Sequence, residues 1–317
     1  MKFAVVGTGV IGSGWITRIL AHGHEVIATD PSEGAYERML KQVKQNWPYA
    51  EQLGLAEGAS LDNLSFTVSL EEAVKDADHI QENVPEIEDL KAQVLTEIDT
   101  YARQDAIIGS STSGIMPSEL QQNLKHPERL VVAHPFHPVY ILPLVEIVPG
   151  KQTAEAVTVK AEKVYESIGM DVLHVRHEIE GHIADRLMEA LWRESLHIVN
   201  EGIATTEEVD KAFTHAAGLR YAQYGPFMTF HLAGGEGGMR HMLKQFGPAL
   251  KKPWTKLIAP ELTQDLYDSV VNGCETASQG QTMSELDQKR NEFLVKVKKL
   301  AEAYWPEDTA SMKKSSK

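Results

Sequence analysis

The fold of this 317-residue chain is decided by the stretch KFAVVGTGVIG at residues 2–12. Residues 3–6 are apolar throughout, which is typical of a short strand that is buried on both faces of a parallel sheet. The glycines that follow have the spacing G-x-G-x-x-G, and a helix is predicted next, over about residues 12–21. A strand, a glycine-rich turn and a helix in this order predict a dinucleotide-binding unit.

Each glycine of this turn has its own physical role in binding a nucleotide. Gly7 permits the tight turn, Gly9 lets the backbone approach a pyrophosphate, and Gly12 lets the helix pack on the strand. The start of a helix also carries unpaired N–H groups that attract an anion. We therefore predict cofactor contacts at Gly7, Gly9, Val10, Ile11 and Gly12, the alternative being a glycine turn in an unrelated α/β domain.

An acidic residue lies at the expected distance beyond the turn. Residues 25–29 predict a second strand, and Asp30 follows it directly. A carboxylate at this position accepts hydrogen bonds from the adenosine ribose hydroxyls and repels a 2′-phosphate. The sequence therefore predicts NAD, rather than NADP, as the cofactor.

Helical and strand patterns alternate until about residue 175 and then give way to helical patterns alone. The alternation predicts a largely parallel, doubly wound α/β sheet, and the later region predicts an all-helical domain. We place an NAD-binding domain at residues 1–180 and a helical domain at residues 181–317. Helices are predicted in the second domain at about residues 183–202, 206–216, 227–246, 262–278 and 284–304.

A candidate acid–base pair lies in the α/β region. His134 directly follows a predicted strand over residues 130–133. Glu146 lies twelve positions later, in the next predicted strand. A histidine can take up and return a proton near neutral pH, and a carboxylate on its other nitrogen would stabilise the imidazolium. A hydroxyl-rich loop that includes Ser113 follows another strand, at the sheet edge where ligands bind. A strand, a turn and a second strand around a buried structural histidine are the alternative.

Composition limits the partners and the location of the protein. The net charge of −14 disfavours nucleic acids and anionic membranes as partners, and no apolar run is long enough to span a membrane. A strand at the very start of the sequence leaves no room for a signal peptide, and the single cysteine, Cys274, fits a reducing compartment. We therefore expect a cytoplasmic protein that binds a small molecule, and we predict no metal site.

The helical domain offers two candidate substrate segments. Asp185, Glu189 and Trp192 have helical spacing and share one face, which could border an interdomain cleft or form a dimer or core seam. Residues 218–227 are aromatic and bounded by glycine, and we predict an irregular loop near the substrate there.

These features together resemble the 3-hydroxyacyl-CoA dehydrogenase superfamily over nearly the whole chain. The resemblance implies a Rossmann domain followed by a helical dimerisation domain, and hence a homodimer. It also implies a catalytic dyad of His134 and Glu146, assisted by Ser113, and cofactor contacts from Glu86 and Lys91.

Within the superfamily, the sequence is most similar to the carnitine 3-dehydrogenase branch. The similarity is carried by HPF at residues 134–136, by ADRL at residues 184–187, by EALWRE at residues 189–194 and by LAGGEGGMRH at residues 232–241. It implies NAD-dependent oxidation of L-carnitine at its 3-hydroxyl to 3-dehydrocarnitine. The alternatives are a 3-hydroxyacyl-CoA or sugar-acid dehydrogenase of the same superfamily, and a crystallin-like structural protein without turnover.

Two positions depart from the hydroxyacyl-CoA pattern, and several aromatic residues suit a quaternary ammonium substrate. Asp185 and His137 each stand where those enzymes have an asparagine. A trimethylammonium group has no proton to donate, so aromatic faces and negative charge are what bind it. The residues that we expect near the substrate are Ser113, Tyr140, Asp185, Glu189, Trp192, Tyr221, Tyr224 and Phe227.

Overall fold

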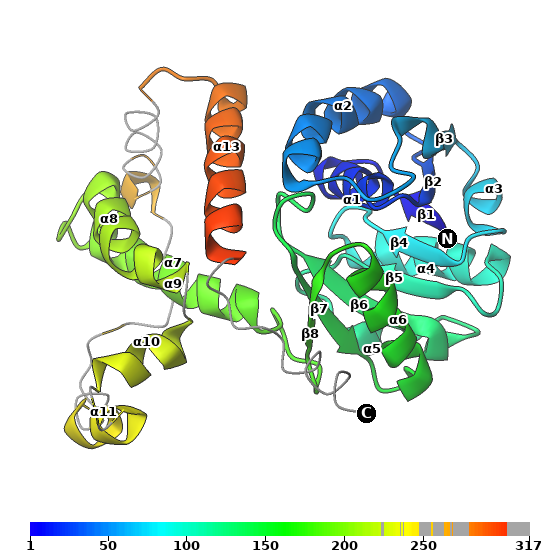
Figure 1. Ribbon diagram of the computed structural model, residues 1–317. Helices are drawn as coiled ribbons and strands as arrows, with labels where there is room; N and C mark the ends of the chain where they lie inside the picture. Colours follow the sequence, from blue (N-terminus) through cyan, green and yellow to red (C-terminus); the bar gives the residue numbers. More distant parts are fainter. Residues whose placement is uncertain are drawn as a thin grey trace, which may run out of the picture. The chain divides into compact units, whose positions relative to one another are not determined.

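The computed structural model describes residues 1–222, 225–234, 236, 238–246, 255, 263–266, 268 and 279–302. The chain divides into two compact units, Met1–Arg186 and Leu187–Lys317 (Figure 1). The first unit is an α/β domain and the described part of the second is helical, so the predicted fold class is confirmed. The predicted domain boundary at residue 181 stays a prediction.

The first unit is built on an eight-stranded sheet with the order β3-β2-β1-β4-β5-β6-β7-β8. Strands β1 to β6 run parallel, whereas β7 is antiparallel to β6 and β8 runs parallel to β7. The strands are β1 (Lys2–Val6), β2 (Glu25–Thr29), β3 (Leu64–Thr67), β4 (His79–Glu82), β5 (Ile107–Ser110), β6 (Leu130–Pro135), β7 (Leu144–Pro149) and β8 (Asp171–His174).

The order of the strands creates a crevice at one edge of the sheet. From β1 the chain moves outward to β2 and β3, and it then returns to form β4 on the other side of β1. The connections that leave β1 and β4 therefore diverge, and the carboxyl ends of these two strands border an open space. This is the edge where an α/β sheet binds its ligands.

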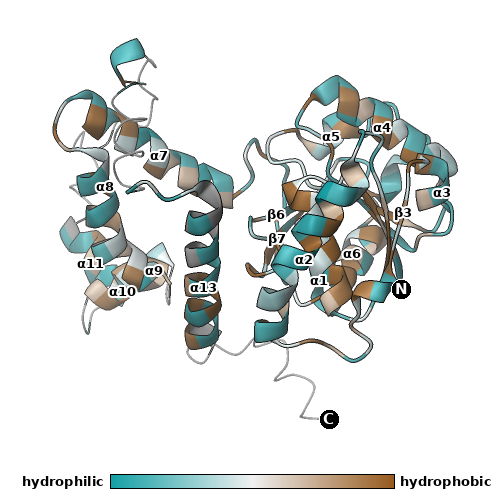
Figure 2. Ribbon diagram, turned by 90° about the horizontal axis from the view of Figure 1, so that it is seen from above, coloured by the Kyte–Doolittle hydropathy of each residue, from teal (hydrophilic) through white to brown (hydrophobic). Residues whose placement is uncertain are grey.

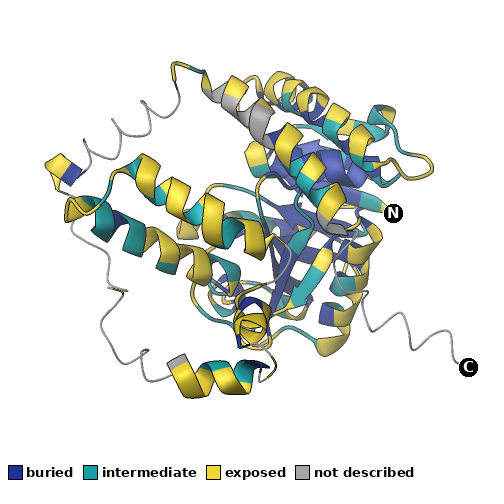
Figure 3. Cartoon of the chain, turned by 60° about the vertical axis from the view of Figure 1, so that its left-hand side comes forward, coloured by how far each residue is buried: buried dark blue, intermediate teal, exposed yellow. Residues whose placement is uncertain are grey.

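Two hydrophobic cores lie on opposite faces of this sheet because side chains alternate along each strand. In β1, Phe3 and Val5 point into one core and Ala4 and Val6 into the other. The central strands are buried, as Figure 3 shows in dark blue, whereas the edge strands β3 and β8 are partly exposed. The surrounding helices are α1 (Val10–Ala21), α2 (Ala35–Leu53), α3 (Leu70–Val74), α4 (Glu88–Tyr101), α5 (Pro117–Leu120) and α6 (Glu155–Ser167).

Each face of the sheet has its own set of helices. Trp15 of α1, Met39 of α2 and Tyr165 of α6 belong to the first core. Val74 of α3 and Leu95 of α4 belong to the second. Each of these side chains is buried, and complete burial of a large apolar side chain stabilises a fold by roughly 1.5–3 kcal/mol. Mixed hydrophobic and hydrophilic segments along the helices are visible in Figure 2.

The described part of the second unit consists of helices. They are α7 (Ala184–Asn200, which begins in the first unit), α8 (Thr206–Ala212), the π-helix η3 (Phe213–Gly218), α9 (Leu219–Tyr221), α10 (Pro226–Ala233), α11 (Gly238–Phe246) and α13 (Met283–Glu302). Thr205 and Glu208 form a capping box at the start of α8, in which each side chain accepts a backbone N–H of the other residue.

Two predictions for the second unit are wrong. Residues 218–227 are not an irregular loop throughout, because η3 and α9 continue the chain as helix as far as Tyr221. Residues 227–246 are not one helix, because the chain is interrupted between α10 and α11. The interruption is a consequence of glycine: a Cβ atom at Gly234 would lie 1.9 Å from the backbone oxygen of Gly238, which has a φ of +55°. The predicted helix at 262–278 falls largely outside the described residues.

The described residues include no helix that is both long and apolar enough to cross a membrane. The same part of the chain contains no group of three or more His, Cys, Asp or Glu side chains arranged to bind a metal ion.

Candidate active site

The glycine-rich turn after β1 forms one wall of the crevice. Gly7 has a φ of +85°, and a Cβ atom there would lie 2.8 Å from the backbone oxygen of Asn83, which follows β4. A Cβ atom at Gly12 would lie 2.0 Å from the oxygen of Gly7. At Gly9, by contrast, a Cβ atom would meet no atom of the described residues within 4 Å. Gly7 and Gly12 are therefore required for packing, whereas Gly9 leaves open space for a ligand.

The crevice has the size and the lining that a dinucleotide requires. Its volume is about 940 Å³, near the upper end of the range of roughly 300–1,000 Å³ that is usual for ligand pockets. Val10 and Ile11, at the start of α1, line it, and the first turn of α1 contains no acidic side chain that would repel a phosphate. Apolar side chains line it as well, among them Val68, Leu70 and Val94.

Asp30 lies at the end of β2 and lines the same pocket. One of its oxygens accepts hydrogen bonds from the Thr8 N–H and hydroxyl, both at 3.0 Å, and the other accepts from the Ser32 N–H at 3.0 Å. Burial alone would raise the pKa of Asp30, but the bonds from Ser32 and Thr8 outweigh it and lower the pKa below 3.8. The carboxylate is therefore ionised and fixed in orientation at the wall of the pocket.

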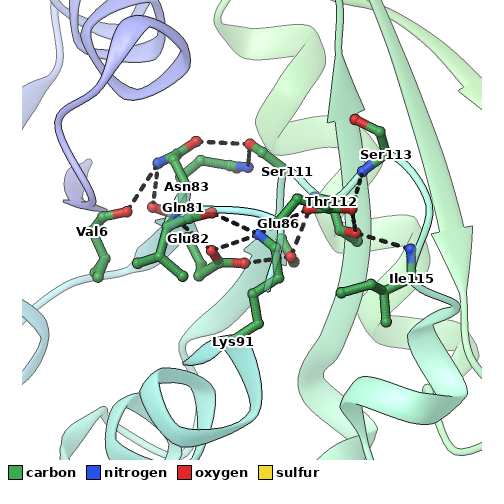
Figure 4. A network of polar contacts seen from close by, with 12 residues as sticks. Val6, Gln81, Glu82, Asn83, Glu86, Lys91, Ser111, Thr112, Ser113 and Ile115 are labelled. Carbon is green, nitrogen blue, oxygen red and sulfur yellow. Dashed lines mark hydrogen bonds and ion pairs between the residues drawn. The ribbon is translucent and has the colours of Figure 1, made fainter. Parts of the chain in front are cut away.

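Glu86 and Lys91 line the pocket beside a network of polar contacts that Figure 4 shows. The Lys91 Nζ donates to Glu82 at 2.9 Å and to the Val84 carbonyl at 3.0 Å, and it lies 3.4 Å from Glu86. The Lys91 side chain is only 1% exposed. Most of its hydrogen-bonding capacity is therefore used within the protein, and a cofactor contact from Lys91 stays a prediction.

Glu86 connects this network to the loop that carries Ser113. It accepts hydrogen bonds from the Thr112 hydroxyl, from the Ser113 N–H at 3.0 Å and from the Gly114 N–H at 3.1 Å. Burial would raise the pKa of Glu86, but these bonds and the charge of Lys91 lower it. Glu86 thus fixes the loop, while the Ser113 hydroxyl points away from the network (Figure 4) and lines the pocket.

His134 and Glu146 form a buried pair whose spacing follows from strand pairing. The two residues are direct partners in the antiparallel ladder of β6 and β7, so their side chains lie on the same face of the sheet. The His134 Nδ1 lies 3.0 Å from a Glu146 carboxylate oxygen, and the Glu146 side chain is fully buried. The offset of twelve positions therefore follows from the register of the hairpin, which places the two side chains in contact.

The other Glu146 oxygen is held by the segment that opens the helical region. It accepts hydrogen bonds from the Ile183 N–H at 2.9 Å and from the Ala184 N–H at 3.0 Å. Burial would raise the pKa of Glu146, but the bonds from His134 and from these two N–H groups outweigh it and lower the pKa. Glu146 is therefore an ionised carboxylate whose bonds fix the orientation of the imidazole.

The second ring nitrogen of His134 faces a second carboxylate. Its Nε2 lies 3.7 Å from Asp185, beyond the length of a hydrogen bond. The imidazole thus lies between two acidic groups. Phe136 packs edge-on against the ring, with the centroids 4.7 Å apart. A histidine in this position can accept a proton at Nε2 while Nδ1 remains bound to Glu146.

The aromatic residues predicted near the substrate have different environments. The Tyr140 side chain is only 6% exposed and packs against Tyr49, so little of its ring is open to a ligand. Trp192, Tyr221 and Phe227 are exposed in the second unit. Glu189, in the same unit, pairs with Arg193 at 3.2 Å. Tyr224 lies outside the described residues.

Comparison with known proteins agrees with this geometry. The 3-hydroxyacyl-CoA dehydrogenase NAD binding domain matches residues 2–179, and the C-terminal domain of that family matches residues 181–279. An L-carnitine dehydrogenase from Staphylococcus epidermidis is 86% identical over 316 residues, which cover 100% of this chain and 98% of the relative. Another, from Oceanobacillus iheyensis, is 64% identical and covers 96% of this chain and 99% of the relative.

The chain belongs to the L-carnitine dehydrogenase family. This family is part of the 3-hydroxyacyl-CoA dehydrogenase superfamily, and the cofactor of the protein is NAD. The glycine turn, the free space at Gly9 and the ionised Asp30 fit this cofactor. A solved 5-formyl-3-hydroxy-2-methylpyridine 4-carboxylic acid 5-dehydrogenase has the same fold, with a TM-score of 0.80 at 27% identity. The superposition covers 95% of this chain and 98% of that structure.

One residue beside the His134–Glu146 pair of this L-carnitine dehydrogenase family member was not predicted from the sequence. His182 is fully buried, and its ring centroid lies 5.4 Å from that of His134. The only sequence signal was a histidine that follows Gly181, where the α/β pattern ends. His137, the histidine nearest to His134 in the sequence, is exposed.

Proposed function

We propose that this protein oxidises L-carnitine at its 3-hydroxyl group and produces 3-dehydrocarnitine and NADH. The observation that carries the proposal is the buried His134–Glu146 pair, at 3.0 Å, in a chain that is 86% identical to an L-carnitine dehydrogenase. NAD, when bound, supplies the acceptor for the hydride that leaves C3. The roles below are those that the residues of this chain would have.

His134 is the general base in this proposal. Its Nε2 removes the proton of the substrate hydroxyl, and Nδ1 remains hydrogen-bonded to Glu146. Glu146 holds the ring in this orientation and stabilises the imidazolium, because the bonds from Ile183 and Ala184 keep its own charge in place. Ser113 assists by donating its hydroxyl to the substrate oxygen.

The crevice would hold the cofactor. The N–H groups at the start of α1 would face the pyrophosphate, Gly9 would allow its close approach, and Asp30 would accept from the ribose hydroxyls. Glu86 and Lys91 shape the wall next to the Ser113 loop.

The trimethylammonium group would be bound by aromatic faces and by negative charge. Each cation–π contact contributes roughly 0.5–2 kcal/mol. Our candidates are the acidic residues of α7 together with the exposed aromatic residues of the second unit, namely Asp185, Glu189, Trp192, Tyr221 and Phe227, with Tyr224 as a further candidate.

The test is a substrate panel that measures NADH formation with L-carnitine, 3-hydroxybutyrate and 3-hydroxybutyryl-CoA. The second compound keeps the hydroxy acid but lacks the cationic head, and the third tests the CoA alternative. We expect L-carnitine to exceed 3-hydroxybutyrate in kcat/KM by more than about tenfold, or about 1.4 kcal/mol. Equal rates, or a preference for the thioester, would contradict the proposal. Absence of turnover with all three would favour a structural role.

We also propose that the protein is a cytoplasmic homodimer that associates through its helical unit. Large apolar side chains are exposed along α7, among them Leu187, Met188 and Leu191, and a partner subunit would bury them. Light scattering at micromolar concentration should give about twice the chain mass of 35.2 kDa. A monomer at that concentration would contradict the dimer.

A further inference from the structure

His182 has hydrogen-bonding groups that the described protein does not use. The residue is 0% exposed, and neither of its ring nitrogens has a hydrogen-bond partner among the described residues. The Thr112 carbonyl is close enough to favour a positive charge on the ring, but it does not meet the geometry of a hydrogen bond. An unpaired buried donor or acceptor costs roughly 1–3 kcal/mol, so a ligand that bonds to the ring would recover this free energy.

The backbone presents this ring to the catalytic pair at a conformational cost. His182 has a φ of +47°, a left-handed conformation that non-glycine residues rarely adopt, and it follows Gly181 at +67°. The next two residues, Ile183 and Ala184, donate their N–H groups to Glu146. The segment that fixes the catalytic carboxylate therefore also fixes His182 beside His134, with the ring centroids 5.4 Å apart.

We propose that His182 is a substrate-binding residue whose ring N–H donates a hydrogen bond to the carboxylate of the bound 3-hydroxy acid. This assignment rests on the proposed function, since it takes the hydroxyl of the same molecule to be bound at His134. The carboxyl carbon and the hydroxyl-bearing C3 are separated by a single carbon atom. Two imidazoles that lie side by side can therefore each bind one of the two oxygen groups.

The charges around the site oppose an anion, so a substrate carboxylate bound there needs a hydrogen-bond donor to hold it. The two acidic side chains nearest to the rings, Glu146 and Asp185, repel an anion, and both of them would attract the cationic head. His182 is the buried side chain next to the dyad that still has a donor to offer. A bond from this donor would offset the repulsion and would orient the substrate with its carboxylate away from Asp185.

The protonation state of His182 separates its role from that of His134. Burial and the neighbouring His134 lower the pKa of His182, although Glu146, Asp185 and the Thr112 carbonyl act in the opposite direction. A lowered pKa keeps the ring neutral, with one N–H to donate, and makes it a weaker base for the hydroxyl proton. His182 can therefore hold the carboxylate while His134 remains the base.

The decisive experiment compares two ligands that differ only in the carboxylate. L-carnitine without its carboxylate is (2-hydroxypropyl)trimethylammonium, which keeps both the hydroxyl and the cationic head. Dissociation constants for both ligands would be measured by calorimetry on the NADH-saturated protein, for the unmodified chain and for His182→Phe. His126→Phe, the same change at a partly exposed position of the α/β unit, is the control.

We expect His182→Phe to weaken L-carnitine binding at least about tenfold and to change the affinity for (2-hydroxypropyl)trimethylammonium less than about twofold. His182→Asn, which keeps a donor, should recover part of the loss. Equal weakening of both ligands would mean that His182 only supports the fold of the site, and unchanged binding of both would mean that it does not touch the substrate. Either result would overturn the proposal. The NADH dissociation constant and the unfolding temperature of each variant establish that it is folded.

Failure of the proposed function would be recognised separately. If the unmodified protein oxidised 3-hydroxybutyrate and did not bind L-carnitine, the substrate would be wrong. His182→Phe would then be compared on 3-hydroxybutyrate and on propan-2-ol, which is the same molecule without its carboxylate. A loss confined to 3-hydroxybutyrate would support the role of His182, and an equal loss on both would overturn it.

Discussion

Two buried pairs, each made of a carboxylate and a basic side chain, lie in the same sheet, and they differ in how many of their polar atoms are hydrogen-bonded. Lys91 and Glu82 form a closed network: the lysine donates to Glu82 and Val84, and Glu82 also accepts from the Ser110 hydroxyl. His134 and Glu146 form an open one. Both Glu146 oxygens accept hydrogen bonds, whereas the His134 Nε2 has no hydrogen bond within the described part of the chain and faces Asp185 at 3.7 Å.

The difference indicates a division of labour between the two pairs. A buried pair with every group satisfied holds the backbone around it, here the connection from β4 that carries Val84 and Glu86. A pair with one free nitrogen at a sheet edge can exchange a proton with a substrate. We therefore expect changes in the closed network to affect stability and changes in the open pair to affect turnover.

The largest expected effect is on turnover, from His134→Gln. The variant should lower kcat by roughly 10²–10⁴, the usual contribution of a positioned acid or base, because the hydroxyl proton has no acceptor. Its unfolding temperature should stay close to that of the unmodified protein, since glutamine can still donate to Glu146. Glu146→Gln should also lower kcat, because the imidazolium loses its partner. Both are measured by steady-state NADH formation.

His137→Gln is the matched control for this prediction. The same substitution at an exposed histidine three residues away should leave kcat nearly unchanged. Near-normal turnover of His134→Gln, with loss of turnover in His137→Gln, would assign the base to His137.

The second effect is on stability, from Lys91→Met. Removing the lysine leaves Glu82 buried without its cation, and such a change costs roughly 3–5 kcal/mol of unfolding free energy. Adding Glu82→Gln should restore much of this loss, because the uncompensated charge is gone. Urea unfolding measures both variants. If the double variant were less stable than Lys91→Met alone, the closed network would not owe its role to charge.

Much of the first unit was predictable because its signals are local. The glycine spacing, the position of Asp30 and the alternation of strands each depend on a few neighbouring residues, and the structure has them as expected. The contact of His134 with Glu146 was predictable because a hairpin register fixes which residues of two adjacent strands face each other.

The errors have physical causes that a local pattern does not contain. The role of His182 depends on a left-handed backbone and on burial, and neither is encoded in its immediate neighbours. The cofactor contact of Lys91, which the family resemblance implies, stays a prediction, and the bonds from Lys91 to Glu82 and Val84 could not be read from the sequence. The division of residues 227–246 depends on a close approach of Gly234 to Gly238.

The third effect is on the pH dependence of stability, and it comes from His79 of β4, whose side chain lies on the face of the sheet opposite to that of Glu82. Its Nε2 lies 2.9 Å from the Tyr165 hydroxyl, its Nδ1 has no partner among the described residues, and burial lowers its pKa from 6.5 to about 4. In the unfolded chain His79 takes up a proton near pH 6.5, whereas in the folded protein it does so only near pH 4. The free energy of unfolding is therefore highest above pH 6.5 and decreases as the pH falls below that value. Stability should therefore fall by roughly 2–3 kcal/mol between pH 6.5 and 4.5.

Urea unfolding at pH 7, 5.5 and 4.5 checks this prediction. His79→Phe has no titrating ring at this position and should make the profile less steep over the same interval, while His24 and His182, whose pKa values burial also lowers, account for the remaining slope. A profile that kept its slope in the variant would assign the acid sensitivity to other groups. Glu86 and Glu146 have lowered pKa values, so the stability that they contribute is lost mainly below pH 4.5. Measurements at or above pH 4.5 therefore report mainly on histidine.

The smallest expected effect is on cofactor choice, from Asp30. This carboxylate is hydrogen-bonded to Thr8 and Ser32 and also lines the pocket, where we propose that it binds the ribose. Asp30→Ala should weaken NAD binding by roughly 10- to 100-fold, the value of hydrogen bonds to a charged group, and narrow the preference over NADP. Asp30→Asn separates the two causes, because it keeps an acceptor and removes the charge. If charge repulsion excludes the 2′-phosphate, Asp30→Asn should raise kcat/KM for NADP while it retains part of the affinity for NAD. Comparable kcat/KM for both cofactors in the unmodified protein would show that Asp30 does not select between them.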